Sequence, residues 1–175
     1  MLVIRGSVVT KAMLGRWLSS PRREQLSLFL YSLKTPMLLL LHPKVVEITT
    51  KRVVIRLPLT FISRNSWGTM FFGAIAAAAD LTGGFHAFEH GPSKKVGVLY
   101  KDCTFQFLRR ADGDLHLVCE DGLSVTDAIA KADLTGERIN VPVSVAGFCY
   151  NHSTTDPVFL SRMTLSLKSL KKKPF

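Results

Sequence analysis

The sequence predicts an α+β fold, in which one central helix packs against an antiparallel sheet of about six strands and extra helices precede the first strand. Three observations predict it. Residues 71–79 are apolar on every side, which is typical of a helix buried on most of its surface. Segments of alternating apolar and polar residues lie before and after this run. A largely apolar stretch of helical character, residues 7–41, precedes them all.

The N-terminal region is predicted to be helical and interrupted by two prolines, Pro21 and Pro36. Five cations and no acid precede Glu24, a bias typical of a transit peptide or of a helix on a membrane surface. The apolar stretch 26–41 is too short and too interrupted for a transmembrane helix. We interpret residues 1–44 as a helical extension that packs on the domain, with weak membrane-surface contact as the alternative.

Two strands are predicted over residues 45–49 and 52–60, joined by a tight polar turn. The inward face of the second strand is predicted to carry Val53, Ile55, Leu57 and Leu59. Later strands are predicted over residues 96–108, 115–120, 141–150 and 158–170.

Three local features are predicted between these later strands. The alternation of the 96–108 segment breaks near Asp102, which indicates a bulge. Residues 111–114 have the composition of a hairpin turn. Ser124 and Asp127 have the spacing that caps a short helix, here expected to end near Leu134.

The central helix is expected over residues 68–81, and two consecutive glycines, Gly83 and Gly84, are expected to end it in left-handed conformations. Asp80 is the only ionisable residue between Arg64 and His86. Because a buried unpaired carboxylate is costly, Asp80 should be paired, hydrogen-bonded or facing a polar cleft. Helical periodicity puts it on one face with small residues, which leaves room for a ligand (Gly73, Ala76 and Ala77). A purely local hydrogen bond near the helix end is the alternative.

A polar loop leads into this helix. Asn65, Ser66 or Thr69 could cap the helix. The first N–H groups of a helix lack intrahelical acceptors and carry partial positive charge. They could therefore bind a carbonyl oxygen or an oxyanion.

The charge balance is strongly basic. Lys and Arg number 23 against 13 acids, a net charge of +10, which indicates an anionic partner. The cations are scattered, and neither zinc-finger spacing nor an RNA-binding aromatic signature occurs, so nucleic acid is not the expected partner. The three cysteines (Cys103, Cys119 and Cys149) form no CxxC pair, so we expect no disulfide framework and no metal site. They favour a reducing compartment, the cytoplasm.

The central segment resembles the hotdog-fold thioesterases, especially the phenylacetyl-CoA thioesterase-like group. The resemblance is carried by Asn65, Gly68, Thr69, Gly73 and Ala74, followed by Asp80, fifteen residues after Asn65. In element order it extends over residues 22–170. It implies a hotdog domain over residues 45–175.

The resemblance also implies roles for individual residues. Asp80 would be the general base for water or the nucleophile, and Asn65 would orient the water or the thioester carbonyl. The N–H of Gly73 would polarise the carbonyl oxygen. Gly68, Thr69, Phe71 and Phe72 would contact the substrate. Phe71 and Phe72 depart from the family, which often has His-Gly there, and could narrow the acyl pocket.

The implied partners are an acyl-CoA or other acyl-thioester substrate and a second copy of the chain, in a homodimer or homotetramer. Asn65 and Asp80 of one site may then come from different subunits. The CoA phosphates need cationic neighbours, for which Lys94, Lys95, Arg109 and Arg110 are candidates.

Competing motifs are weaker. His86, Glu89 and His90 fit HxxEH, but the pattern directly precedes Gly91-Pro92, where a helix would be ending. No GxSxG elbow or phosphate-binding glycine loop occurs. The sequence therefore predicts an acyl-CoA thioesterase-like hydrolase without a cofactor. The alternative is a non-catalytic acyl-CoA or fatty-acyl binding protein, associated with a membrane surface.

Overall fold

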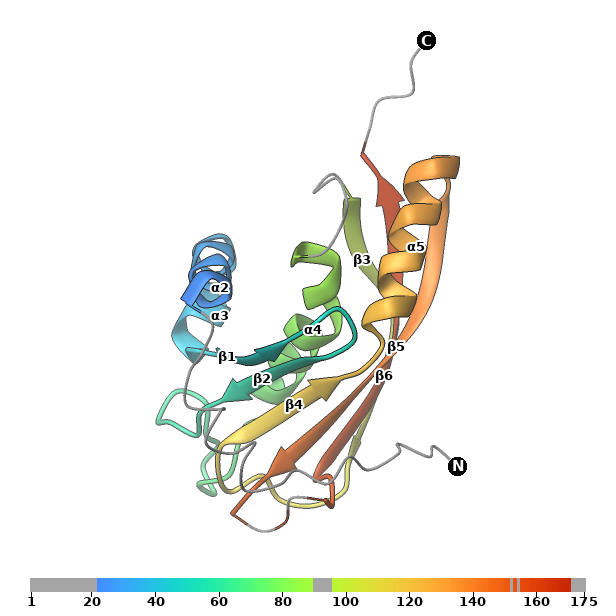
Figure 1. Cartoon of the computed structure of the whole chain (residues 1–175). Helices are drawn as coiled ribbons and strands as arrows, with labels where there is room; N and C mark the ends of the chain where they lie inside the picture. The colour runs from blue at the N-terminus through green and yellow to red at the C-terminus, as the bar shows by residue number, and fades with distance from the viewer. Residues whose placement is uncertain (1–21, 90–95, 152, 154, 171–175) are drawn as a thin grey trace.

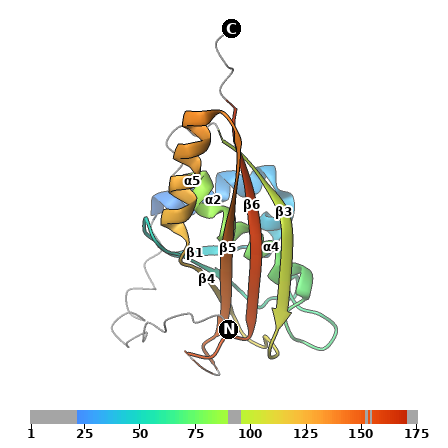
Figure 2. The ribbon, with the colours of Figure 1, turned by 90° about the vertical axis from the view of Figure 1, so that its right-hand side faces the viewer.

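A computed structural model describes residues 22–89, 96–151, 153 and 155–170. It is an α+β protein with a six-stranded antiparallel sheet in the order β1-β2-β4-β5-β6-β3. The curved sheet surrounds α4 on one side, and α2 and α3 lie on the other side of that helix (Figure 1 and Figure 2). The elements are α2 (Arg22–Lys34), α3 (Pro36–Leu41), β1 (Lys44–Ile48), β2 (Val53–Leu57), α4 (Phe72–Glu89), β3 (Val96–Phe107), β4 (Leu115–Cys119), α5 (Gly122–Thr135), β5 (Arg138–Cys149) and β6 (Phe159–Ser169).

The two N-terminal helices break at Pro36, as predicted. Gln25 ties α2 to the start of the sheet, because its Oε1 accepts a hydrogen bond from the Val45 amide at 3.0 Å. Leu28 and Leu38 are buried in the same core as the sheet. The predicted basic helix before residue 22 lies outside the described residues, and the domain division at residue 44 stays a prediction.

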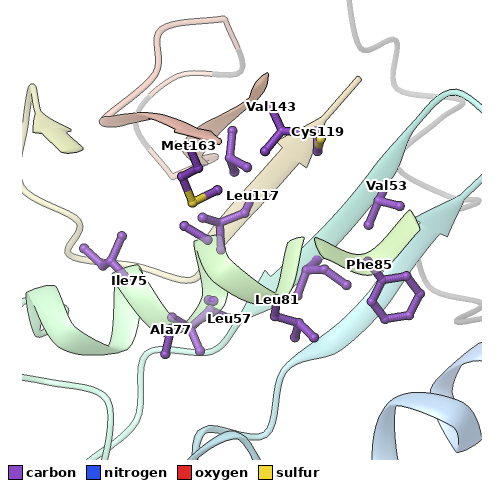
Figure 3. Close-up of a cluster of buried hydrophobic side chains, with 14 of the residues drawn as sticks. Val53, Leu57, Ile75, Ala77, Leu81, Phe85, Leu117, Cys119, Val143 and Met163 are labelled. Carbon is purple, nitrogen blue, oxygen red and sulfur yellow. The ribbon is translucent and has the colours of Figure 1, made fainter. Parts of the chain in front are cut away.

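The core lies between α4 and the concave face of the sheet, where side chains from both layers interdigitate (Figure 3). The predicted inward residues Val53, Ile55 and Leu57 are fully buried. On α4, Leu81 and Phe85 point into the same cluster. Burying large apolar side chains of this kind contributes roughly 1.5–3 kcal/mol each, so this layer holds α4 in place.

The predicted bounds of the central helix, 68–81, are wrong, because α4 begins at Phe72 and continues to Glu89. Gly83 and Gly84 lie inside the helix and do not have positive φ angles. Their role is close packing. A Cβ on Gly83 would lie 2.7 Å from Met163 Cε, and one on Gly84 would lie 3.0 Å from the Tyr100 hydroxyl. The glycines therefore let β6 and β3 approach the helix.

The predicted hairpin turn at residues 111–114 is also wrong. β3 and β4 are not neighbours: β3 pairs with β6 at one edge of the sheet, while β4 lies between β2 and β5. The segment is a crossover between distant strands. The predicted bulge is confirmed, because the register of β3 against β6 shifts between Tyr100 and Asp102.

The predicted cap of α5 is replaced by another arrangement. The helix begins at Gly122, two residues before Ser124, and its N-cap Asp121 makes no side-chain capping bond. The Asp121 carboxylate instead accepts a hydrogen bond from the Ser144 amide at 2.7 Å, which ties α5 to β5. Gly136 ends the helix with a φ of 69°, and its N–H donates to the Ala132 carbonyl.

None of the helices in the described part of the chain has both the length and the apolar character needed to cross a bilayer.

Candidate functional site

A narrow stripe of α4 is left uncovered by the rest of the chain. Phe72 and Asp80 are exposed, and Gly73 and Ala76 are partly exposed, while most other residues of the helix are buried. Of the three small residues predicted to share a face with Asp80, Gly73 and Ala76 lie on this open side, whereas Ala77 is buried. Asp80 therefore faces outward, toward whatever covers this stripe.

Asp80 is flanked by groups from two other elements. Tyr31 of α2 and Tyr100 and Cys103 of β3 lie close enough for its charge to act on them. Tyr100 donates its hydroxyl hydrogen bond to the main-chain oxygen of Asp80 at 2.5 Å. Within the described residues, no cation forms an ion pair with Asp80.

The pKa of Asp80 is raised. Its side chain is exposed in the isolated chain, yet the neighbouring helix and strand remove part of its hydration, and this desolvation is the main cause. Hydrogen bonding from Tyr100 opposes the rise. A carboxylate that is poorly solvated and has no cationic partner is more basic than an ordinary aspartate, as a general base must be.

The loop before α4 is held together by Asn65. Its Oδ1 accepts hydrogen bonds from the amides of Trp67 (3.0 Å) and Thr69 (3.2 Å), and its Nδ2 donates to Thr69 Oγ1 at 2.9 Å. Gly68 completes the turn with a φ of 79°, a conformation that favours glycine. The Asn65 and Thr69 side-chain bonds thus close the loop on itself and do not reach the amides of α4.

The first turn of α4 presents two amides. Ala74 and Ile75 both donate to the Phe71 carbonyl, whereas the amides of Phe72 and Gly73 have no acceptor within the described residues. The Phe71 ring packs against Gly73, where a Cβ would lie 2.5 Å from a ring carbon. Because helix N-termini carry partial positive charge, these two amides can donate hydrogen bonds to an oxygen with developing negative charge.

The predicted residues form two groups and not one. Asn65, Gly68, Thr69 and the start of α4 lie together, but Asp80 follows Gly73 by seven residues, about 10 Å along a helix. An oxyanion donor must lie about 3 Å from the carbonyl oxygen, and a general base about 3 Å from the water that attacks the carbonyl carbon. The Gly73 amide and Asp80 of one chain are separated by about two helical turns.

None of the residues of β3 is fully buried, and the strand pairs with β6 on one side only. Three large apolar side chains near or at this edge are about half exposed or more: Leu99, Phe107 and Leu108. An unpaired edge of 12 residues is a template for pairing with another strand.

Cations lie close to the loop before α4. The Met70 amide donates to the Ala111 carbonyl at 2.7 Å, which brings the segment after Arg109 and Arg110 beside that loop. Arg109 pairs with Asp156 at 3.4 Å, and Arg110 is exposed. The other two candidates, Lys94 and Lys95, lie outside the described residues.

The remaining candidate features of the chain are a cavity, the metal-binding motif and the cysteines. A cavity of about 100 Å³ lies between α2, α3 and the start of β1, and none of its lining residues belongs to α4 or β3. Within the described part of the chain, no group of three potential ligands could hold a metal. His86 of the HxxEH pattern is buried, and His90 falls outside the described residues. All three cysteines are free thiols.

Comparison with known families gives one match. Residues 23–154 match the model of a family described as a domain of unknown function, DUF4442. The chain belongs to this family. No curated protein sequence matches this DUF4442 protein.

Solved structures resemble it over most of its length. They include a Pseudomonas aeruginosa protein called a probable thioesterase (TM-score 0.69, 21% identity, 83% of this chain and 95% of that one). A Chlorobaculum tepidum protein of unknown function gives a TM-score of 0.72 at 11% identity, covering 86% and 97%. A Haemophilus influenzae thioesterase gives 0.59 at 14% identity, covering 79% and 86%. At these identities the likeness shows the fold, and the DUF4442 protein has the hotdog fold expected from its sequence.

Sequence reasoning missed Tyr31 and Tyr100, the two aromatic residues beside Asp80. Tyr31 belongs to α2, whose packing against α4 has no local signal. Tyr100 shares the inward face of Val96 and Val98, and the break in alternation at Asp102 lies directly after it.

Proposed function

We propose that this DUF4442 protein is an acyl-CoA thioesterase. The observation that carries the proposal is the poorly solvated carboxylate of Asp80, which lies on the open stripe of a largely apolar central helix. The hotdog fold, shared with proteins named as thioesterases, supports it.

The reaction is the hydrolysis of an acyl thioester. Asp80 accepts a proton from a water molecule as the water oxygen attacks the carbonyl carbon. The oxygen of the resulting tetrahedral intermediate is stabilised by the Gly73 amide. The C–S bond then breaks, the carboxylic acid leaves, and the CoA thiolate takes up the proton held by Asp80. In the alternative route Asp80 attacks the carbonyl carbon itself, the C–S bond breaks and the CoA thiolate leaves, and water then hydrolyses the mixed anhydride to the carboxylic acid and free Asp80.

The active unit is a homodimer, or a homotetramer built from such dimers. The partner's copy of β3 pairs with the free edge of β3 and extends the sheet. The seven-residue separation between Gly73 and Asp80 supports this arrangement, because a shared site can combine the Gly73 amide of one protomer with the partner subunit's Asp80.

Asn65 acts through its remaining donor in this proposal. Both acceptor positions of Oδ1 and one Nδ2 proton are used within the loop. The second Nδ2 proton is available to the thioester carbonyl or the water. Gly68 and Thr69 hold this loop in shape, and Phe71 and Phe72, both exposed, contact the acyl group.

The acyl carrier is CoA, because its phosphates match the basic surface. Arg110 is exposed beside the loop before α4, and Arg109 lies next to it. The net charge of +10 favours an anionic substrate in general. No cofactor is needed, since water, a base and an oxyanion donor suffice for the chemistry.

A panel of acyl-CoA thioesters of different chain lengths, assayed by thiol release, tests the proposal. We expect saturable turnover of at least one member, above the rate in buffer. A panel that is bound but never hydrolysed would instead support the second candidate function below.

That second candidate is a non-catalytic acyl-CoA or fatty-acyl binding protein on a membrane surface. It is favoured by an exposed apolar stripe on α2 and α3, at helical spacing: Leu26, Phe29, Leu30, Leu33, Met37 and Leu40. Residues 25–46 contain no acid, and Lys34 and Lys44 are exposed beside the stripe. Apolar side chains flanked by cations are typical of helices that lie on anionic lipid.

Vesicle binding tests this surface. The full chain is expected to cosediment with vesicles containing anionic phosphatidylserine and much less with neutral ones. Leu30→Ser with Leu33→Ser should weaken cosedimentation by about 10-fold or more, since each buried leucine contributes roughly 1.5–3 kcal/mol. Leu134→Ser on α5, an exposed leucine elsewhere, is the matched control. Equal binding of all three proteins would exclude a role for the stripe in membrane contact.

A further inference from the structure

We propose that Tyr100 is a positioning residue that holds the Asp80 turn of α4 in its working geometry. This inference rests on the proposed function only for its kinetic consequence, because the contacts themselves belong to the folded chain. Three independent features of β3, α4 and β6 place the Tyr100 hydroxyl against this turn.

The first feature is the bulge in β3. In a regular strand residues 100 and 103 would face opposite sides of the sheet, because side chains alternate. Here the register shift between Tyr100 and Asp102 adds one residue, so Tyr100 pairs with Leu165 and Cys103 pairs with Met163. Both partners are fully buried core residues of β6. Tyr100 shares the inward face of Val96 and Val98, and the bulge that follows it lets Cys103 face the same side, so both residues lie on the side of the sheet that faces α4.

The second feature is the pair of glycines one turn beyond Asp80. A Cβ on Gly84 would lie 3.0 Å from the Tyr100 hydroxyl oxygen, closer than ordinary van der Waals contact. A Cβ on Gly83 would lie 3.6 Å from the same atom. No other part of α4 offers two adjacent residues without side chains, so the hydroxyl reaches the helix backbone only here.

The third feature is the hydrogen bond itself. The Tyr100 hydroxyl donates to the main-chain oxygen of Asp80, and hydrogen bonding from Tyr100 also lowers the pKa of the Asp80 carboxyl. The hydroxyl has one proton, so it can donate to only one of the two oxygens at a given moment, and the geometry in the structure favours the main-chain carbonyl. Burial raises the pKa of Tyr100 itself, which keeps it protonated as a donor at physiological pH.

These contacts link the free edge of the sheet to the carboxylate. β3 is the strand whose outer edge is free in one chain, and Tyr100 projects from it onto the helix turn that carries Asp80. A displacement of β3 would move the hydroxyl away from the main-chain oxygen that it holds in the turn carrying Asp80. Tyr100 thus affects both the position of Asp80 and the pKa of the Asp80 carboxyl group.

The test is Tyr100→Phe, which removes one oxygen and keeps the ring. In a carbon-13 NMR titration of the carboxyl groups of the intact protein, we expect the Asp80 pKa to be higher in Tyr100→Phe than in the wild type. In the thioesterase assay, kcat should fall about tenfold with KM changed less than about twofold, as for the loss of one hydrogen bond. The acid limb of the kcat profile should move to higher pH.

Tyr150→Phe is the matched control, because Tyr150 packs on His116 and lies away from Asp80. Its Asp80 titration and kinetics should equal those of the wild type. An unchanged Asp80 pKa in Tyr100→Phe would overturn the inference, whether or not the protein hydrolyses acyl-CoA. If the Asp80 pKa is higher in Tyr100→Phe than in the wild type, but the wild type hydrolyses no acyl-CoA, the result would support the inference and contradict the proposed function.

Discussion

Replacing Asp80 by asparagine is expected to lower kcat for thioester hydrolysis by about 10²–10⁴-fold, the contribution of a positioned general base. Asparagine has nearly the same shape but does not accept the proton of the attacking water. If Asp80 is instead the nucleophile, the same substitution removes the attacking oxygen and the loss is at least as large. The measurement is thiol release at saturating acyl-CoA. Activity equal to that of the wild type would remove Asp80 from the mechanism.

The same substitution should not weaken the fold. An acid whose pKa is raised in the folded state disfavours folding once it is ionised, so its effect on the free energy of unfolding is unfavourable above the ordinary aspartate range. Asp80→Asn removes this charge. We therefore expect the free energy of unfolding in urea at pH 7 to be equal to or higher than that of the wild type.

Asp114→Asn is a control for which we expect the opposite effect on the free energy of unfolding. Burial opposes ionisation of Asp114, but hydrogen bonds from the Leu59 amide and the Arg56 guanidinium outweigh it and lower its pKa. Such a group stabilises the fold above its unfolded pKa, and this stability is lost as pH falls through the folded pKa. Asp114→Asn should lower the free energy of unfolding at pH 7 while leaving an Asp80-dependent reaction in place. A loss of stability in Asp80→Asn would contradict the account of its environment.

Lysines on the free edge of β3 should separate the protomers. We expect Leu99→Lys with Leu108→Lys to raise the dimer dissociation constant by about four orders of magnitude. Each leucine buried in an interface contributes roughly 1.5–3 kcal/mol, and twofold symmetry doubles each substitution. Lysines also discourage strand pairing at sheet edges.

Sedimentation velocity measures this change, and the thioesterase assay measures its consequence. The monomer should lose activity, because the proposed site combines the Gly73 amide of one protomer with the partner subunit's Asp80. Leu134→Lys on α5 adds a lysine at another exposed leucine and should leave both the dimer and the activity unchanged. A fully active monomer would show that one chain contains a complete site.

The sequence predicts those parts of the fold that depend on local pattern. The alternation of apolar and polar residues predicts which residues of β2 face the core, and the break in alternation near Asp102 predicts the bulge of β3. The unbroken apolar run 71–79 predicts the buried central helix, and Asp80, directly after this run, predicts which turn of the helix is open.

The remaining features depend on long-range packing. Gly83 and Gly84 are a pair typical of a helix end, yet the helix continues through them. Tyr100 and Met163 fill the space where side chains at these two positions would lie. The segment 111–114 has the composition of a hairpin, yet β3 pairs with a strand about 60 residues away (Tyr100 with Leu165, for example). The resemblance implied that Asn65 and Asp80 of one site may come from different subunits, and this arrangement stays a prediction because local sequence spacing carries no information about the second subunit.

The most direct test of the central claim is a crystal structure of Asp80→Asn bound to an acyl-CoA that the wild type hydrolyses. The account predicts a thioester carbonyl oxygen within hydrogen-bond distance of the Gly73 amide of one protomer. It also predicts the carbonyl carbon beside position 80 of the other protomer, across paired β3 strands. A thioester bound elsewhere, with position 80 out of reach of its carbonyl carbon, would contradict the account.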